Sequence, residues 1–355
     1  MFGDRLLRAR KAAGFSQKVL SEKVGVSANM IKKYEKGQSM PDSGRLVQLA
    51  KSLDVRSEYF FRPQNPKLNK VEYRKKSRIG KKRLDTISHV ILDQIERRLE
   101  LEDLFPKPPV SEFQLPEDLP GVINDLDEIE GIAMSLHEQW NLGFNPIPDL
   151  VDLFESKGIR VFLIEAGQND LFDGLLAHVN DIPVIAIGKC WPGDRQRFTL
   201  AHELGHLLLE GRLAEGIKHE KASDRFAGAF LFPQIAVEDS LGSNRTRLPD
   251  REIHDLKQEY GLSMFGIIYR AYNLGIISEG YLKSCFFRYR DKGWIKQEPG
   301  EQLPPEKARI FNKMVFHAFG EGYIGESKAA ELLNMKRTEF RKFRRIEGPD
   351  ADSCQ

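Results

Sequence analysis

The stretch FTLAHELGHLLLE, residues 198–210, contains two histidines and a glutamate in the spacing H-E-x-x-H. Residues four apart share one face of a helix, so His202 and His206 can direct ring nitrogens at one cation. Glu203 can reach a metal-bound water without being a ligand, as a general base must. Chance alone produces this spacing on the order of once in a hundred chains of this length. The stretch predicts a helix with a catalytic zinc site, provided that a third ligand exists.

A second segment, HEKASDRFAGAFLFP at residues 219–233, offers that ligand. Glu220 and Asp224 are four residues apart and share a helix face. We expect Glu220 to complete a His2Glu site, and Asp224 to accept a hydrogen bond from the other ring nitrogen of a ligand histidine. Two alternatives stay open. His219 could be the third ligand, or the two acids could form an ordinary solvated helix face.

These motifs resemble the ImmA/IrrE family of bacterial metallopeptidases. RQRFTLAHELGHLLLE (195–210) and EKASDRFAGAFLFP (220–233) carry the resemblance, and DGLLAHVNDIPVIAIG (173–188) is similar to the strands that precede the family's active-site helix. The family pattern at the second motif is E-x-x-A-N-x-F-A, whereas this chain has Ser223 and Asp224 at its A-N positions. Aspartate can still orient a histidine, so we expect the site to survive.

The resemblance implies a zincin-like fold, one Zn²⁺ per chain on His202, His206 and Glu220, and Glu203 as base. Another divalent metal is an alternative at the same ligand geometry. The implied reaction is metal-assisted peptide hydrolysis, in which Glu203 moves a proton from water to the leaving amine. The oxyanion requires a further group, and the sequence does not choose among His178, Tyr260 and Arg225.

Residues 17–36 have the layout of a helix-turn-helix, with Gly25 at the turn and Ser16 and Ser27 as N-caps. Asparagine suits adenine, and lysine suits guanine or phosphate. The expected DNA contacts are Gln17, Ser27, Ala28, Asn29, Lys32 and Lys33. The alternative is a small helical bundle that binds protein or only spaces domains.

RLLRARKAAGFSQKVLSEKVGVS (5–27) and YEKGQSMPD (34–42) are similar to the XRE-type, lambda-repressor-like DNA-binding family. The resemblance implies that double-stranded operator DNA is a partner. Because the second helix has few basic residues near its start, affinity is expected to depend on a homodimer or on the basic run at residues 67–83. That run, with nine basic residues and one acid, could equally be a solvated linker.

We expect a multi-domain chain. An all-α helix-turn-helix domain (1–62) precedes a basic linker and amphipathic helix (63–118). An α+β zincin-like metallopeptidase domain (119–290) follows, with helices at 123–140 and 147–157 and strands at 159–165, 174–179 and 182–188. A helical C-terminal region (291–355) ends the chain.

The C-terminal region is expected to contain two short helices around residues 334–336, with Ser327 as a cap. The exposed basic residues expected there are Arg337, Arg341, Lys342, Arg344 and Arg345. We favour a packing element with a soluble basic end over a second nucleic-acid contact.

Composition limits the class of protein. The net charge of +2 makes no case by itself for a nucleic-acid partner. Three widely spaced cysteines argue against a disulfide framework, and the sequence has neither an apolar signal segment nor a membrane span. These observations favour a cytoplasmic protein without a membrane partner.

The preferred interpretation is a DNA-binding zinc endopeptidase. As the resemblance to the ImmA/IrrE family implies, it would cleave an XRE-type repressor in a stress, mobile-element or phage-related response. The alternative substrate is its own DNA-binding region, with the segment from Arg62 to Arg83 as the expected place of the cut. The alternative is a non-catalytic transcription regulator or antitoxin-like protein that uses the metallopeptidase fold as a sensor.

Overall fold

The computed structural model describes residues 2–62, 72–73, 80–107, 109–117, 119–165, 172–179 and 181–345. Contacts divide the chain into two compact units. The first unit contains residues up to 111, residues 178–181 and residues from 309 onward, and the second contains 112–177 and 182–308. The second unit therefore lies in sequence between residues 1–111 and 309–355 of the first, and residues 178–181 within it are grouped with the first unit. Most of the basic run at 67–83, with the expected self-cleavage region, lies outside the described residues.

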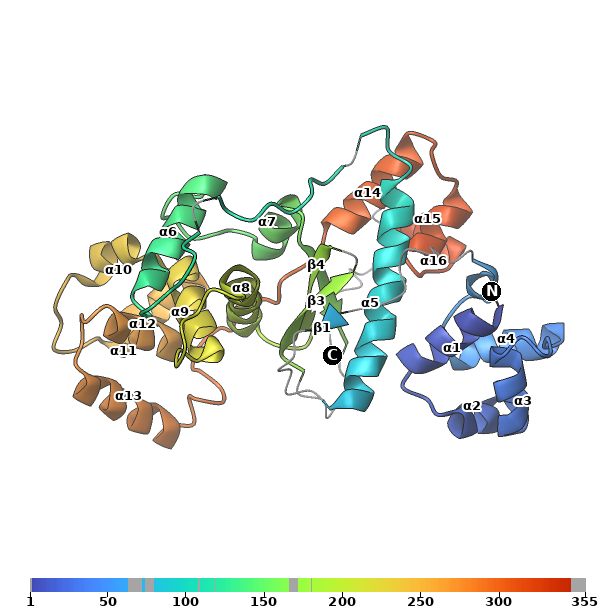
Figure 1. Cartoon of the computed structure of the whole chain (residues 1–355), viewed down its shortest axis with the longest axis horizontal. Helices are drawn as coiled ribbons and strands as arrows, with labels where there is room; N and C mark the ends of the chain where they lie inside the picture. Colours follow the sequence, from blue (N-terminus) through green and yellow to red (C-terminus); the bar gives the residue numbers. More distant parts are fainter. Residues whose placement is uncertain are drawn as a thin grey trace. The chain divides into compact units, whose positions relative to one another are not determined.

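The first unit is largely helical (Figure 1). Its elements are α1 (Phe2–Ala12), α2 (Gln17–Val24), α3 (Ala28–Glu35), α4 (Ser43–Ser52), the 3-10 helix η1 (Ser57–Phe61), the short strand β1 (Glu72–Tyr73), α5 (Lys81–Glu102), α14 (Ile310–Gly320), α15 (Glu326–Leu332) and α16 (Arg337–Phe343).

The N-terminal helices form the predicted helix-turn-helix. Ser16 and Ser27 cap α2 and α3, each accepting a hydrogen bond from a backbone N–H three residues on. Gly25 ends α2 at φ 67°, a left-handed conformation in which glycine lacks the steric cost of a side chain. Leu20 and Ile31 are fully buried in the core that holds these helices together. Both capping predictions are confirmed.

The C-terminal helices are packed rather than a loose tail. Val315, Ala329 and Phe340 share a core with Leu101, the residue by which α5 joins this cluster. The two-helix prediction is confirmed, but the cap prediction is wrong. Ser327 lies inside α15, whose N-cap is Gly325.

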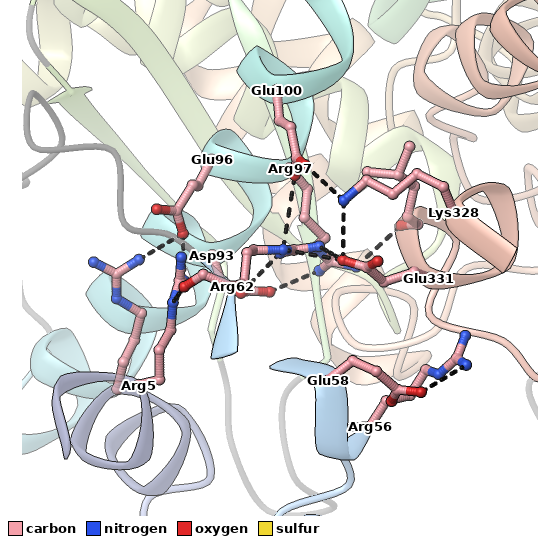
Figure 2. A network of polar contacts seen from close by, with 12 residues as sticks. Arg5, Arg56, Glu58, Arg62, Asp93, Glu96, Arg97, Glu100, Lys328 and Glu331 are labelled. Carbon is pink, nitrogen blue, oxygen red and sulfur yellow. Dashed lines mark hydrogen bonds and ion pairs between the residues drawn. The ribbon is translucent and has the colours of Figure 1, made fainter. Parts of the chain in front are cut away.

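Arg62 connects the helix-turn-helix to the C-terminal helices within this unit (Figure 2). Its guanidinium donates to Glu331 of α15 at 2.7 and 3.1 Å, and it lies 3.7 Å from Glu100 of α5. Arg5 donates to the Arg62 carbonyl oxygen and pairs with Glu96 of α5 at 2.5 Å. The Arg5 and Arg62 side chains are at most 5% exposed, so solvent screens these pairs little.

The second unit combines helices with strands. Its elements are α6 (Glu128–Trp140), α7 (Leu150–Ser156), β2 (Arg160–Ile164), β3 (Gly174–Val179), β4 (Ile182–Gly188), α8 (Gly193–Leu209), α9 (His219–Leu231), α10 (Gln234–Leu241), α11 (Asp250–Tyr260), α12 (Met264–Asn273) and α13 (Glu279–Asp291). In the described part of the chain, no helix is long and apolar enough to span a bilayer.

Strand β4 lies between β3 and β2 and runs parallel to β2, with Arg160 opposite Val184 and Ile164 opposite Gly188. The three predicted strands are confirmed, as is the fold class: a helical N-terminal domain, an α+β region and a helical C-terminus. The start of the helix predicted at 123–140 is wrong. Ile123 instead forms a parallel bridge with Leu213, and α6 begins at Glu128.

Helices α8 and α9 pack closely against each other (Figure 1). A Cβ on Gly205 of α8 would lie 3.0 Å from the Phe226 ring and 3.2 Å from the Cα of Ser223 on α9. Phe226 is fully buried at this contact. The absence of a side chain at Gly205 therefore sets how near the two helices approach.

A larger residue at this contact should destabilise the second unit. Gly205→Leu is expected to cost about 1–3 kcal/mol by overpacking. Gly131→Leu on α6 is the control, because a Cβ there meets nothing within 4 Å. Thermal unfolding of both variants tests this expectation. Equal melting temperatures would contradict the proposed limit on helix approach.

The contact between Arg62 and Glu331 should make unfolding of the first unit depend on pH. Burial raises the pKa of Glu331, but Arg62 and Lys328 outweigh it and hold that pKa below its usual value. A lowered folded-state pKa stabilises the fold above the ordinary glutamate pKa of about 4.3, and this contribution disappears as the pH falls through the folded-state value.

Glu331→Gln should therefore lower the melting temperature at neutral pH, and the difference from wild type should shrink below about pH 4. Glu321→Gln removes an exposed acid after α14 and serves as control. Melting curves across that pH range test this. A difference that persists unchanged in acid would contradict the assignment.

Candidate functional site

The H-E-x-x-H stretch lies in α8, and the segment at 219–233 begins with α9. His202, His206 and Glu220 each bring one ligand atom to within 4.8 Å of the others. The two Nε2 atoms lie 3.8 and 3.6 Å from the carboxylate oxygens of Glu220. Two ligand atoms on a tetrahedral zinc are about 3.4 Å apart when each bond is about 2.1 Å. The donor set and its spacing therefore fit a metal site.

Both histidines are oriented from behind by adjacent residues of α9. Nδ1 of His202 lies 2.8 Å from Oδ1 of Asp224, and Nδ1 of His206 lies 2.6 Å from Oγ of Ser223. An ionised carboxylate only accepts hydrogen bonds, so Asp224 places the proton of neutral His202 on Nδ1 and leaves the Nε2 lone pair for a metal. The serine oxygen can accept from Nδ1–H of His206 in the same way.

The charge around His202 favours its protonated form. Burial disfavours the imidazolium, but the hydrogen bond that His202 donates to Asp224 and the charges of Asp224, Glu203 and Glu220 together raise the pKa of His202 above its ordinary value. A site that attracts a proton in this way also attracts a divalent cation, because both interactions are with the same negative charge.

Glu203 is 8% exposed and lies on α8 beside β3. A Cβ on Gly174 would lie 3.5 Å from Oε1 of Glu203 and 2.4 Å from the Thr199 side chain. The backbone of β3 therefore passes close to this carboxylate because Gly174 has no side chain. This arrangement leaves Glu203 in a largely dry position next to an extended strand.

Four other residues are alternatives for the third ligand or for the group that stabilises the oxyanion. Among the described residues, the metal-site group does not include His219, whose ring centroid is 6.5 Å from that of His206. Arg225 pairs with Glu130 at 2.7 Å and with Asp127 at 3.1 Å, which engages its guanidinium. The Tyr260 ring stacks on Phe232 at 3.9 Å. His178 lies on β3 and is half-buried.

The role of Ser223 was not anticipated from the sequence. It is fully buried, and in the sequence it stands out only as a departure from the family pattern. The feature of the sequence that could have indicated this role is that Ser223 directly precedes Asp224. Adjacent residues on α9 can each reach one of two histidines that are one turn apart on α8, provided that the helices approach closely.

The predicted DNA-contacting residues lie at the start of α2 and along α3. Asn29, Lys32 and Lys33 are exposed, Ser27 is an exposed N-cap, and Ala28 is half-buried. Gln17 donates to Glu35 at 2.7 Å, so its amide is partly used within the domain. Arg10 also pairs with Glu35, at 2.5 Å, and fixes α3 against α1. The exposed side of α3 is thus polar and basic.

Removing the groups that orient the histidines should weaken zinc binding. Ser223→Ala and Asp224→Ala are each expected to lower zinc affinity about 10–100-fold. The zinc affinity of Asp224→Asn should lie between those of wild type and Asp224→Ala, because the amide oxygen still accepts a hydrogen bond but carries no charge. Competition with a chromophoric chelator measures the affinity, and Ser284→Ala on the exposed side of α13 is the control. Unaltered affinity in the α9 variants would contradict the orienting roles.

Two family models match separate parts of the chain. Residues 6–60 match the family model for a helix-turn-helix, and residues 154–272 match the model for an IrrE N-terminal-like domain of the peptidase M78 group.

Three curated relatives are HTH-type or other transcriptional regulators by name. An uncharacterized regulator of Sinorhizobium fredii, y4wC, is 37% identical over 75 residues, which are 21% of this chain and 50% of the relative. A regulator in the ATPase CF(0) region of Rhodospirillum rubrum is 39% identical over 59 residues, 17% of this chain and 55% of the relative. ImmR of Bacillus subtilis is 34% identical over 59 residues, 17% of this chain and 46% of the relative.

The chain spans about half the length of these relatives. The two family matches, by contrast, fall on the helices that carry the predicted DNA contacts and on the strands and helices that carry the candidate metal site. The chain therefore carries an XRE-type helix-turn-helix domain followed by an IrrE/ImmA-like domain.

Proposed function

We propose that this chain is a DNA-tethered zinc metalloendopeptidase that cleaves a regulatory protein. The observation that carries the proposal is the arrangement on α8 and α9. Three ligand atoms converge, both histidines are held through Nδ1, and a buried glutamate follows the first histidine. A solvated helix face would not require this set of contacts.

His202, His206 and Glu220 would hold the metal, leaving one position of a tetrahedral site open. The bound ion would supply Lewis-acid polarisation of the scissile carbonyl and a lowered pKa for its water. Ser223 and Asp224 keep the two imidazoles in the tautomer that presents Nε2. A closed metal site would use a fourth protein ligand, which this group of three does not provide.

Glu203 would act as general base and then as general acid. It accepts a proton from the attacking water and transfers it to the leaving amine. Its low exposure keeps competing bulk water away from the carboxylate. The β3 backbone at Gly174 lies beside this carboxylate and helps to shield it from solvent.

The helix-turn-helix domain supports a substrate that acts on DNA. Exposed Asn29, Lys32 and Lys33 can contact an operator, which would place the peptidase near proteins bound at the same site. The favoured substrate is a separate XRE-type repressor, and the alternative is this chain's own DNA-binding region. The regulator names of the curated relatives support a role in transcription.

Replacement of the base should abolish cleavage without removing the metal. Glu203→Gln keeps the size of the side chain and is expected to reduce the appearance of new peptide N-termini by about 10²–10⁴-fold. The measurement compares protein N-termini in cells that express wild type or variant, with and without DNA-damaging or oxidative stress. An end that requires Glu203 identifies the substrate, including this chain itself.

Glu210→Gln provides the matched control, since it makes the same chemical change at the exposed C-cap of α8. It should cleave as wild type does. If wild type and Glu203→Gln give the same N-termini while both bind zinc and DNA, the peptidase proposal fails. A non-catalytic regulator with a metal-sensing site would then be the better description.

A further inference from the structure

The turn between α15 and α16 has the backbone geometry of the turn between α2 and α3. In the first turn Gly25 is left-handed at φ 67°, and the N–H of Val26 bonds to the carbonyl of Ser21 at 3.0 Å. In the second, Asn334 is left-handed at φ 52°, and the N–H of Met335 bonds to the carbonyl of Ala330 at 2.9 Å. Each left-handed residue is followed two positions later by the N-cap of the next helix.

The side chains around the two turns correspond when the left-handed residues are superposed. Leu20 and Ala329 are buried, as are the small residues Ser21 and Ala330 one position later. Ile31 and Phe340 are buried on the second helix of each pair. One difference is that Leu332 is buried where the first pair has the exposed residue Lys23.

The second helix pair is fixed by its own core. The ring of Phe340 lies 5.7 Å from that of Phe316 and 5.3 Å from that of Phe319, both on α14. These contacts bury one side of α16 and leave Arg341 and Lys342 exposed on the other. Their positions correspond to Lys32 and Lys33 of α3.

The exposed side of α16 is strongly basic. Residues 336–345 contain six basic residues and one acid, a net formal charge of +5, and all of them except Phe340 are exposed. Residues 28–36 of the first pair contain three lysines and one glutamate. A cationic helix of this kind is complementary to the phosphate backbone of a duplex.

We propose that α15 and α16 form a second helix-turn-helix, which binds double-stranded DNA through phosphate contacts from Arg341 and Lys342. This proposal rests on the DNA-binding part of the proposed function, and it does not depend on peptidase activity. Arg62, through its bonds to Glu331, joins the two helix pairs within one unit.

The carboxylate of Glu326 lowers the positive charge of the exposed side of α16. Glu326 occupies the position of Gln17, and its carboxylate accepts from Arg337 at 2.7 Å and from Arg341 at 2.8 Å. The carboxylate therefore offsets part of the positive charge that a phosphate would meet. Removing that negative charge should strengthen DNA binding, whereas a role for the cluster in packing alone predicts no such gain.

The experiment measures binding of the full-length chain to a mixed-sequence duplex by fluorescence anisotropy at several salt concentrations. Each lost phosphate contact lowers the magnitude of the log–log salt slope by about 0.9. Arg341→Ala/Lys342→Ala should lower the magnitude of this slope by up to about 1.8. The ratio of wild-type affinity to variant affinity should therefore fall roughly tenfold between about 50 and about 200 mM salt. Glu326→Gln should tighten binding.

The matched variant is Lys32→Ala/Lys33→Ala, which tests the first helix-turn-helix alone. Arg251→Ala/Lys283→Ala removes two exposed charges of the other unit and controls for net charge. An α16 variant that melts as wild type and keeps its affinity and salt slope overturns the inference. An α3 variant without effect counts instead against DNA binding by the first pair. If Arg251→Ala/Lys283→Ala weakens DNA binding as much as Arg341→Ala/Lys342→Ala does, the effect comes from net charge alone and the inference is overturned.

Discussion

The close packing of α8 on α9 is the constraint on which the candidate metal centre depends. Gly205 lets the backbone of α9 approach, and that approach brings Ser223 and Asp224 behind the histidines while Glu220 reaches their front. The contacts of Ser223 and Asp224 with the histidines span 17 and 22 positions in sequence. A site assembled in this way is oriented by core packing, so its geometry is as rigid as the two helices are.

The ligand pattern could be predicted because it is local. Four-residue spacing places His202 and His206 on one helix face, whatever surrounds the helix. The bond between Ser223 and His206 could not be predicted in this way, since it depends on the crossing of two helices. The same holds for Gly174, whose importance appears only when β3 is placed next to Glu203. Periodicity describes one element at a time, and these contacts lie between elements.

The ends of the chain illustrate the same limit. Apolar spacing and caps were enough to predict α2 and α3, because Ser16, Gly25 and Ser27 are residues that favour caps and turns. The second turn uses Asn334 in place of glycine and Lys336 in place of serine at the cap, so the local signal is weaker. Its likeness to the first turn emerges from backbone bonds and burial rather than from residue identity.

The contacts of Arg5 and Arg62 bear on how a cut in this chain would act. The helix-turn-helix is held to α5 through Glu96 and to α15 through Glu331, with the arginine side chains almost fully buried. Breaking one partner of a buried pair is costly because the other charge is left without compensation. Cleavage between residue 62 and α5 would therefore leave the two fragments associated through these pairs. Release of the DNA-binding helices by self-cleavage would require that the Arg62 network also be broken, whereas cleavage of a separate repressor has no such requirement.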